Sequence, residues 1–244
     1  MTTQRNIRLH IESHLEASKE CELSLDKSHY LCNVMRCKEG DVISCFNEND
    51  GEFISKIVKI DKKRTIIEAQ SLKKAPQKES DIWLLFAPLK KENTDFVIEK
   101  STELGVGKII PVITRFTNSD KIRLSRFISQ AIEASEQCER MSVPKIEDAT
   151  KLKSVLENWN KTRTIFFMNE RREATSIINA FSEHSNKPAA LLIGPEGGFS
   201  DDEAQYITKF PFVKSVSLGP RILRAETAAI SALAVWQATV GDWN

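Results

Sequence analysis

Hydrophobic positions in the first part of the chain follow the two-residue period of short strands. Ile7, Leu9 and Ile11 alternate with polar residues, and an apolar run covers 42–46. A strand with one buried face shows this alternation. Turns rich in Asn, Asp and Gly separate the runs, as expected of hairpins. We therefore predict a small β-barrel over residues 1–72.

Two segments of this part differ from the strand pattern. Residues 28–36 place apolar side chains at helical spacing and predict a short helix. Residues 71–80 are polar, contain Pro76 and lack periodicity, so we predict a linker there. A basic edge accompanies the predicted strands. It consists of Lys56, Lys59, Lys62, Lys63 and Arg64. Lysines on an exposed edge oppose edge-to-edge pairing of strands, and they are equally suited to contact RNA phosphates.

From residue 80 to residue 244 the pattern alternates between continuous apolar runs and amphipathic helices. Continuous runs are typical of strands covered on both faces, and they occupy 82–87, 108–113, 164–168, 189–193 and 213–218. Helical periodicity covers residues up to Leu104, then 122–138 and 226–240. Pro111 suggests a sheet edge or a strand end. This alternation predicts an α/β domain with a mainly parallel sheet.

The last predicted helix has little polar surface on any side. Alanine, leucine, isoleucine, valine and tryptophan dominate residues 228–238. A helix that is apolar all round is expected to be buried all round. We expect one of its faces to meet a second copy of the chain, because that apolar area would otherwise be exposed. The alternative is that it threads the core of its own domain.

Composition excludes several classes of protein. The chain has 244 residues and no apolar run long enough to span a bilayer. Its first residues contain no apolar signal core, so we expect a cytoplasmic protein. Five cysteines without a Cys-x-x-Cys pair indicate neither a disulfide framework nor a zinc site, and the four histidines lack metal-type spacing. A net charge of +1 leaves nucleic-acid binding open.

Two similar loops near the C-terminus carry the candidate chemistry. Gly194-Pro-Glu-Gly-Gly198 and Ser217-Leu-Gly-Pro220 each end an apolar run and precede a helix. Parallel sheets bind ligands at such strand ends. Ser200-Asp-Asp-Glu203 predicts a capping box, whose acids occupy the helix end where a phosphate would bind. A cofactor without phosphates and with a cationic centre suits these loops better, and S-adenosylmethionine is the obvious candidate.

At these loops the chain resembles the SPOUT superfamily of knotted methyltransferases, and within it the bacterial 16S ribosomal RNA uracil-N3 methyltransferase family. The resemblance rests on five segments that run nearly end to end: His29–Arg36 with Gly40-Asp41, Glu99–Gly105 with Ile110-Pro111, Ala131–Gln137 with Arg140 and Pro144, Ile193–Ser200, and Ser217–Arg224 with Glu226-Thr227. It implies an N-terminal PUA-like, RNA-binding barrel over residues 1–72. It also implies a methyltransferase domain over residues 80–244 with a trefoil knot that binds S-adenosylmethionine. The partners implied are 16S ribosomal RNA in the small subunit and a second copy bound through the knot and the C-terminal helix, without metal or membrane.

Methyl transfer to uracil N3 requires that a weakly acidic proton leave the ring. Glu226 could act as the general base, or it could simply favour the start of the last helix. Arg221 and Arg224 could stabilise charge on the uracil oxygens, or they could hold RNA phosphates. We expect these three to be the catalytic residues.

Two further sets of residues are expected to bind ligands. Backbone groups of the loops, with apolar side chains that could equally be ordinary core, are expected at the cofactor: Met168, Ile193, Gly194, Glu196, Gly197, Leu218, Gly219, Ile222, Leu223 and Thr227. Residues of the barrel that could equally be solvated or half-packed are candidate RNA contacts: Arg5, Arg8, His29, Tyr30 and Arg36.

Other functions compete with this one. Ribose 2′-O-methylation of RNA uses the same superfamily fold, and a non-catalytic RNA-binding protein could keep the fold without the cofactor. An oxidoreductase with a phosphate-bearing cofactor is disfavoured by the acids at the start of the helix after Ser200.

Overall fold

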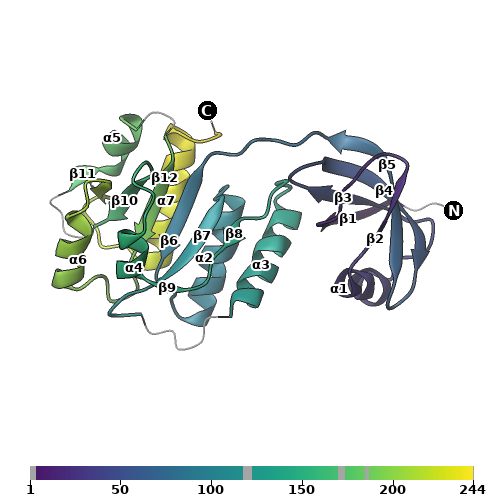
Figure 1. Cartoon of the computed structure of the whole chain (residues 1–244), viewed down its shortest axis with the longest axis horizontal. Helices are drawn as coiled ribbons and strands as arrows, with labels where there is room; N and C mark the ends of the chain where they lie inside the picture. Colours follow the sequence, from purple (N-terminus) through teal and green to yellow (C-terminus); the bar gives the residue numbers. More distant parts are fainter. Residues whose placement is uncertain (1–3, 118–122, 170–173, 185–186, 244) are drawn as a thin grey trace. The chain divides into compact units, whose positions relative to one another are not determined.

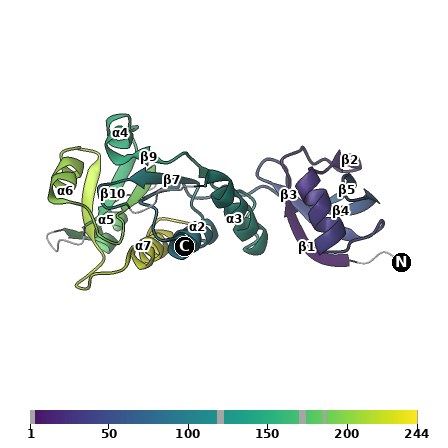
Figure 2. The same ribbon diagram turned by 90° about the horizontal axis from the view of Figure 1, so that it is seen from below.

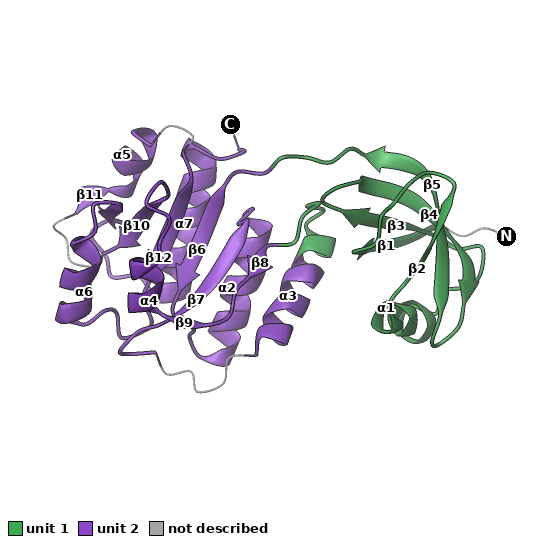
Figure 3. Ribbon diagram, viewed as in Figure 1, with its two compact units in different colours: residues 1–78, 135–143 green, residues 79–134, 144–244 purple. Residues whose placement is uncertain are grey.

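A computed structural model describes residues 4–117, 123–169, 174–184 and 187–243. The chain forms two compact units, shown in separate colours in Figure 3. The first unit comprises residues 1–78 and 135–143, and the second comprises residues 79–134 and 144–244. Residues 135–143, which we call the returning segment, therefore pack with the first unit although they lie far along the chain.

The first unit is built on a five-stranded mixed sheet, so the predicted short strands are confirmed. Its strands follow the order β1 (Gln4–His10), β3 (Val42–Asn47), β4 (Gly51–Ile60), β5 (Thr65–Lys74) and β2 (Lys19–Glu22). The β1 and β3 strands pair in parallel, and the other neighbours pair antiparallel. Inward-facing side chains from all five strands, including Leu9, Ile43, Ile57, Ile67 and Cys21, form one apolar cluster.

Three details of this unit differ from the sequence prediction. The β2 strand was not predicted, because only Cys21 of its four residues is buried and no alternation is visible. The predicted linker begins too early, since β5 continues as far as Lys74 and pairs with β4 there. The predicted helix begins earlier, as α1 (Leu25–His29), and continues as a π-helical turn, η1 (Tyr30–Val34).

The second unit is an α/β domain whose sheet is parallel throughout, as predicted (Figure 1). The sheet order is β11 (Thr175–Ser176), β13 (Val213–Ser217), β10 (Thr164–Met168), β12 (Ala189–Ile193), β6 (Ile82–Phe86), β7 (Lys108–Ile113) and β8 (Lys145–Ile146), and β9 (Thr150–Lys151) also pairs with β7. The predicted ranges of β7, β10 and β12 match the structure, because these strands are continuous apolar runs bounded by polar residues.

Helices cover both faces of this sheet, and successive residues of β10 show the division. Phe166 packs edge-on against Phe181 of α5 (Ile177–Ser182), while Phe167 points to the other face and meets Phe199. Figure 2 shows α2 and α7 on one side of the sheet and α4 and α6 on the other. Their bounds are α2 Lys91–Glu103, α7 Ala225–Thr239, α4 Leu152–Glu157 and α6 Asp201–Thr208; α3 spans Leu124–Gln137, and residue 122 of its predicted range lies outside the described residues.

Two expectations about this unit need correction. Pro111 does not mark the outer edge of the sheet, because β7 pairs with β6 on one side and with two short strands on the other. Pro111 lies where that second partner changes from β8 to β9, so its missing N–H breaks no ladder bond there. The last helix is not buried all round. Ala229, Leu233 and Trp236 are buried, but Ile230 and Val235 are only half-buried within one chain.

Candidate active site at the ends of four parallel strands

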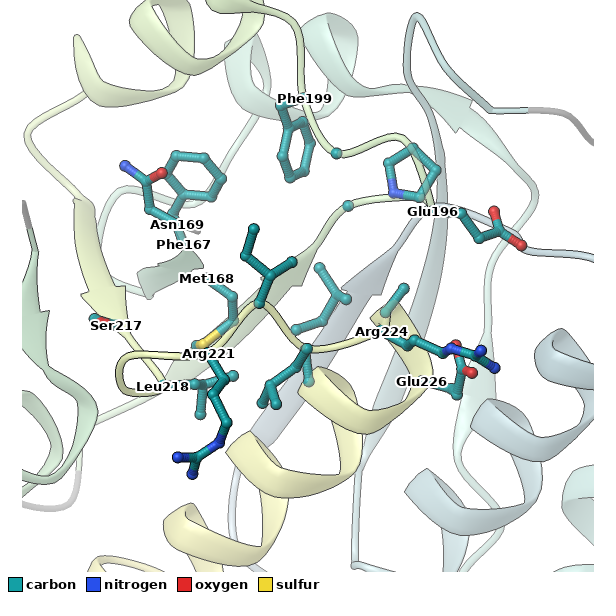
Figure 4. Close-up of a pocket in the computed structure, with 18 of the residues that line it drawn as sticks. Phe167, Met168, Asn169, Glu196, Phe199, Ser217, Leu218, Arg221, Arg224 and Glu226 are labelled. Carbon is teal, nitrogen blue, oxygen red and sulfur yellow. The ribbon is translucent and has the colours of Figure 1, made fainter. Parts of the chain in front are cut away.

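A pocket of about 690 Å³ lies at the carboxyl ends of β13, β10, β12 and β6, which are neighbours in the sheet (Figure 4). Its volume falls within the range of about 300–1,000 Å³ that is common for small-molecule sites. The walls come from the segments that follow these strands. The lining residues that carry the argument are Met168, Asn169, Gly194, Leu218, Arg224 and Glu226. The position agrees with the rule that parallel sheets bind ligands at their carboxyl edge.

The loop after β12 is held by contacts of its own residues. Gly194 must lack a side chain, because a Cβ there would lie 2.7 Å from the Phe199 ring. The Glu196 carboxylate accepts a hydrogen bond of 3.1 Å from the Lys90 N–H at the start of α2. The predicted capping box at Ser200 and Glu203 is confirmed. The first N–H groups of α6 are thus partly satisfied by the protein, which disfavours a phosphate there.

The loop after β13 turns sharply back toward α7. The Ser217 hydroxyl accepts a hydrogen bond of 3.2 Å from the Gly219 N–H. Gly219 has φ +105°, a conformation that glycine adopts without strain. Beyond this turn, Ile222 lines the pocket with 75% of its surface exposed. An apolar side chain this exposed at a pocket rim is suited to cover a ligand.

The start of α7 brings charged groups into the pocket. Arg224 is the residue that precedes the helix and its side chain makes no capping hydrogen bond, and Glu226 lies in the first turn. The Oε2 atom of Glu226 is buried and has no hydrogen-bond partner in the described part of the chain. A buried polar atom without a partner costs about 1–3 kcal/mol or more, so its presence suggests a functional role.

The two arginines of this loop are available to a ligand. Arg221 and Arg224 are exposed, and neither forms an ion pair with any residue that the structure describes. Figure 4 shows Arg224 and Glu226 on the side of Glu196, whereas Arg221 lies on the side of Met168 and Leu218. The pocket therefore has one end with the Glu226 carboxylate and the Arg224 guanidinium, and another end where Arg221 accompanies apolar side chains.

Most residues expected at the cofactor or at the chemistry line this one pocket. They are Met168, Ile193, Gly194, Glu196, Leu218, Gly219, Arg221, Ile222, Leu223, Arg224 and Glu226. Gly197 and Thr227 are not among the lining residues. A Cβ on Gly197 would lie 3.2 Å from Phe116, so this glycine serves local packing, and Thr227 is exposed on the outer side of α7.

Sequence reasoning missed several lining residues. Lys90 and Asn93 lie at the start of α2, after β6, and Phe167, Asn169 and Phe199 complete the wall near β10. No motif marks Lys90 or Asn93. A usable signal existed nonetheless, because the start of α2 follows a buried strand of the same parallel sheet and must lie at the same edge.

Arg8 of the first unit is occupied by contacts within that unit. Its Nε pairs with Glu52 Oε2 at 2.9 Å, and its other nitrogens donate to the carbonyls of Ser135 and Arg140, both at 2.8 Å. The guanidinium also lies 3.5 Å above the centre of the Phe46 ring. Every polar face of Arg8 is used, and these bonds fasten the returning segment to the sheet.

The neighbouring charges of this unit are also paired. Glu52 is fully buried. Burial alone would raise its pKa, but hydrogen bonds from Lys73 and Arg8 outweigh that effect and lower the pKa below its usual value. Arg5 forms an ion pair of 3.1 Å with Asp41 while remaining 36% exposed. Arg8 is thus fully engaged within its unit, whereas Arg5 is paired through its Nε alone, and RNA contact by these two residues stays a prediction.

The other three RNA candidates lie on one exposed surface. His29 ends α1, Tyr30 begins η1, and Arg36 follows η1 with φ +51°. All three side chains are exposed, and the nearby Leu25 and Val34 are more than half exposed. Exposed aromatic, apolar and basic groups together are typical of RNA-binding surfaces.

Within the four described ranges, no cluster of three or more His, Cys, Asp or Glu residues could hold a metal ion. Among the helices of those ranges, none has the length and apolar character needed to cross a bilayer. All five cysteines are free thiols, and burial raises the pKa of Cys45 to about 12.

Comparisons with known proteins show the family to which the chain belongs. A family model described as an RNA methyltransferase domain matches residues 76–237, and one described as an RNA methyltransferase PUA domain matches residues 25–70. The chain is 36% identical to the ribosomal RNA small subunit methyltransferase E of Rickettsia conorii, with 93% of each chain covered. It is 34% identical to the protein of that name from Buchnera aphidicola subsp. Acyrthosiphon pisum, with 97% of this chain and 95% of the relative covered.

Solved structures show the same architecture over the whole chain. The ribosomal RNA small subunit methyltransferase E of Neisseria gonorrhoeae, crystallised with S-adenosylmethionine, has a TM-score of 0.88 and 26% identity, covering 98% of this chain and 100% of its own. A Legionella pneumophila methyltransferase solved with the same cofactor has a TM-score of 0.86 and 30% identity, covering 98% and 99%. The chain therefore belongs to the family of RNA methyltransferases that includes the ribosomal RNA small subunit methyltransferases E.

Proposed function

We propose that this chain transfers a methyl group from S-adenosylmethionine to N3 of a uracil in 16S ribosomal RNA of the small subunit, in the cytoplasm. The observation that carries the proposal is the pocket at the strand ends. It combines an apolar wall at Met168 and Leu218 with a charged end where one oxygen of Glu226 is buried without a partner. The relatives named for ribosomal RNA methylation support the substrate class.

The residues present fit S-adenosylmethionine. Met168, Leu218 and Ile222 offer apolar contact for an adenine, and the turn at Gly219 leaves open space where a Cβ would otherwise stand. The internal capping of α6 by Ser200 disfavours phosphate-bearing cofactors. Ile193, Gly194, Glu196 and Leu223 would contribute backbone or apolar contacts. When bound, the cofactor supplies a methyl group on a sulfonium and leaves as a neutral thioether.

The charged end of the pocket would handle the uracil proton. Glu226 accepts the proton of N3, and the electron pair left on N3 forms the bond to the methyl carbon. When bound, the cofactor would give up the methyl carbon and keep the electron pair of the broken carbon–sulfur bond on sulfur. Arg224 and Arg221 can donate hydrogen bonds to the oxygens on which the negative charge develops. Because the Oε2 atom of Glu226 has no hydrogen-bond partner among the described residues, it is available for this role.

The remaining surfaces suit RNA and a second copy. His29, Tyr30 and Arg36 are exposed together on the first unit and are proposed to contact RNA. Ile230 and Val235 on α7 are only half-buried in one chain, which supports a homodimer in which α7 packs against its copy. The trefoil knot that the family resemblance implies stays a prediction.

The decisive experiment uses small ribosomal subunits from a strain that lacks this activity. Incubation with the purified chain and labelled S-adenosylmethionine, followed by nucleoside digestion and mapping, should place the label on a 3-methyluridine of 16S ribosomal RNA. Label on a ribose 2′-oxygen, or on transfer RNA alone, would refute the assignment. No cofactor binding at millimolar concentration would instead indicate a non-catalytic RNA-binding protein.

A further inference from the structure

The start of α2 contributes two polar side chains that no part of the fold uses. Lys90 and Asn93 both line the pocket, Lys90 at its exposed rim and Asn93 half-buried. Among the described residues, neither side chain forms a hydrogen bond or an ion pair. Neighbouring side chains of α2 differ, since the Thr94 hydroxyl bonds the backbone of Leu89 and Lys100 pairs with Glu99 and Glu103. Lys90 and Asn93 are therefore available to a ligand.

Contacts at both ends of α2 fix its position beside α7. At its start, the Glu196 carboxylate accepts a hydrogen bond from the backbone N–H of Lys90. At its end, the buried Gln237 of α7 donates from Nε2 to the carbonyl of Leu104 at 2.6 Å. The starts of both helices line the same pocket, so Lys90 and Asn93 share it with Arg224 and Glu226.

We propose that Lys90 and Asn93, together with Arg224 and Glu226, recognise the Watson–Crick edge of the target uracil. This inference rests on the proposed function. The edge of uracil presents a carbonyl oxygen, an N–H and a second carbonyl oxygen. Lys90 and Arg224 can only donate, the Asn93 amide offers two donors, and ionised Glu226 can only accept. The pocket thus has donors for both carbonyls and an acceptor for the N–H.

The same set of hydrogen-bond donors and acceptors disfavours cytosine. Cytosine carries an amino group in place of the O4 carbonyl and has no proton on N3. Its amino group would face the donors Lys90 and Arg224, with only the Asn93 carbonyl oxygen able to accept from it, and Glu226 would face an acceptor nitrogen. A site built to hydrogen-bond one set of groups rejects an analogue that leaves its polar groups unpaired, by factors that reach 10⁴–10⁵. Discrimination would therefore come from the start of α2 as much as from the loops.

Lys90 also has a role in the reaction itself. When Glu226 takes the N3 proton, negative charge spreads over both carbonyl oxygens of the ring. The charged groups that line this end are Lys90, Arg224, Glu196 and Glu226, and Glu196 is engaged with the Lys90 backbone. The Lys90 ammonium thus joins the Arg224 guanidinium as a cation that can stabilise the uracil anion at this end of the pocket.

The test compares Lys90→Met, Lys90→Arg and Asn93→Ala with the control Lys91→Met, whose exposed side chain does not line the pocket. Methyl transfer to unmodified small subunits is measured from pH 6 to 10, with S-adenosylmethionine affinity from calorimetry. We expect Lys90→Met to lower the rate constant about 10²-fold, as for a lost oxyanion donor. Its pH–rate profile should move to higher pH, because the uracil anion is less stabilised. Lys90→Arg should restore the profile, Asn93→Ala should lower the rate about 10-fold, as for one lost hydrogen bond, and cofactor affinity should stay unchanged.

Three outcomes would overturn the proposal. Wild-type rates and pH profiles in both Lys90→Met and Asn93→Ala would mean that neither side chain meets the base. Loss of cofactor affinity would assign them to the methyl donor. A changed salt dependence of subunit binding with an unchanged pH profile would make Lys90 a phosphate contact. If the wild-type chain itself methylates no uracil, the proposed function fails, and that result is distinct from all three.

Discussion

Two pairs of arginines, one in each unit, lie in different environments. Arg8 donates to a buried carboxylate and to two carbonyls, and Arg5 pairs with Asp41. Arg221 and Arg224 have no ion pair among the described residues and lie at the walls of a pocket. Arg8 has its hydrogen-bonding capacity filled by the protein and Arg5 is paired through its Nε, whereas Arg221 and Arg224 retain their capacity for a ligand.

The difference shows that the partners of a charged group indicate its role better than its type does. A guanidinium whose donors are all satisfied by buried acceptors stabilises the fold, and its removal leaves those acceptors unpaired. A guanidinium without acceptors beside a pocket can meet the oxygens of a substrate. The same contrast holds for carboxylates, since Glu52 is paired and Glu226 is not.

The largest expected effect comes from the unpaired carboxylate. Glu226→Gln keeps the shape of the side chain but removes the base. We expect methyl transfer to fall by about 10²–10⁴-fold, the usual contribution of general base catalysis. Cofactor affinity, measured in parallel by calorimetry, should stay within a factor of about two. Full activity of the variant would remove Glu226 from the mechanism.

The next effect tests the paired arginine. Arg8→Ala leaves Glu52 buried with one hydrogen-bond donor fewer and removes the bond from Arg8 to Ser135 of the returning segment. The first unit should therefore lose about 3–5 kcal/mol of unfolding free energy. All four tryptophans lie in the second unit, so their fluorescence does not report on this loss. Hydrogen exchange of the β1 and β3 amides is the suitable measurement. Unchanged protection in those strands would contradict the structural role of Arg8.

The stability of the first unit is expected to depend on pH through His10, which lies in β1 together with Arg8. Burial, with the nearby charges of Lys27 and Arg8, lowers the pKa of His10 from 6.5 to about 4. Between these values the unfolded chain binds a proton that the folded chain does not. The first unit should therefore lose stability as the pH falls from 6.5 toward 4, and His10→Asn should flatten that slope. The readout is denaturant unfolding followed by far-ultraviolet circular dichroism, and an unchanged slope in the variant would reject the assignment.

The smallest effect belongs to the partly exposed pair. The Arg5 side chain is 36% exposed, so solvent screens its attraction to Asp41. Arg5→Ala should lower the unfolding free energy of the first unit by less than about 1 kcal/mol. A loss as large as that from Arg8→Ala would show that exposure does not separate these two arginines.

Local patterns made much of the second unit predictable. Continuous apolar runs located β7, β10 and β12, and the Gly-Pro loops located most of the pocket, because both signals are local in sequence. Lys90 and Asn93 were missed, since an ordinary helix start carries no motif. Only the sheet order, with β6 beside β12, shows that α2 begins at the same pocket.

Non-local pairing was the part that could not be predicted. Arg8 looks like an exposed strand residue in the sequence, and its partners lie 44, 127 and 132 residues away. The returning segment belongs to the first unit for the same reason. The short β2 strand was missed because its pairing with β5, not its composition, makes it a strand.

The central claim is that RNA meets the unpaired charges of the pocket and not the paired charges of the first unit. The most direct test is the salt dependence of binding to unmodified small subunits, measured for Arg221→Ala, Arg224→Ala and Arg5→Ala. Each phosphate contact contributes about 0.7–0.9 to the slope of log K against log salt. We predict a shallower slope or a lower affinity for both pocket variants and wild-type behaviour for Arg5→Ala. The reverse pattern, with only Arg5→Ala impaired, would contradict the claim.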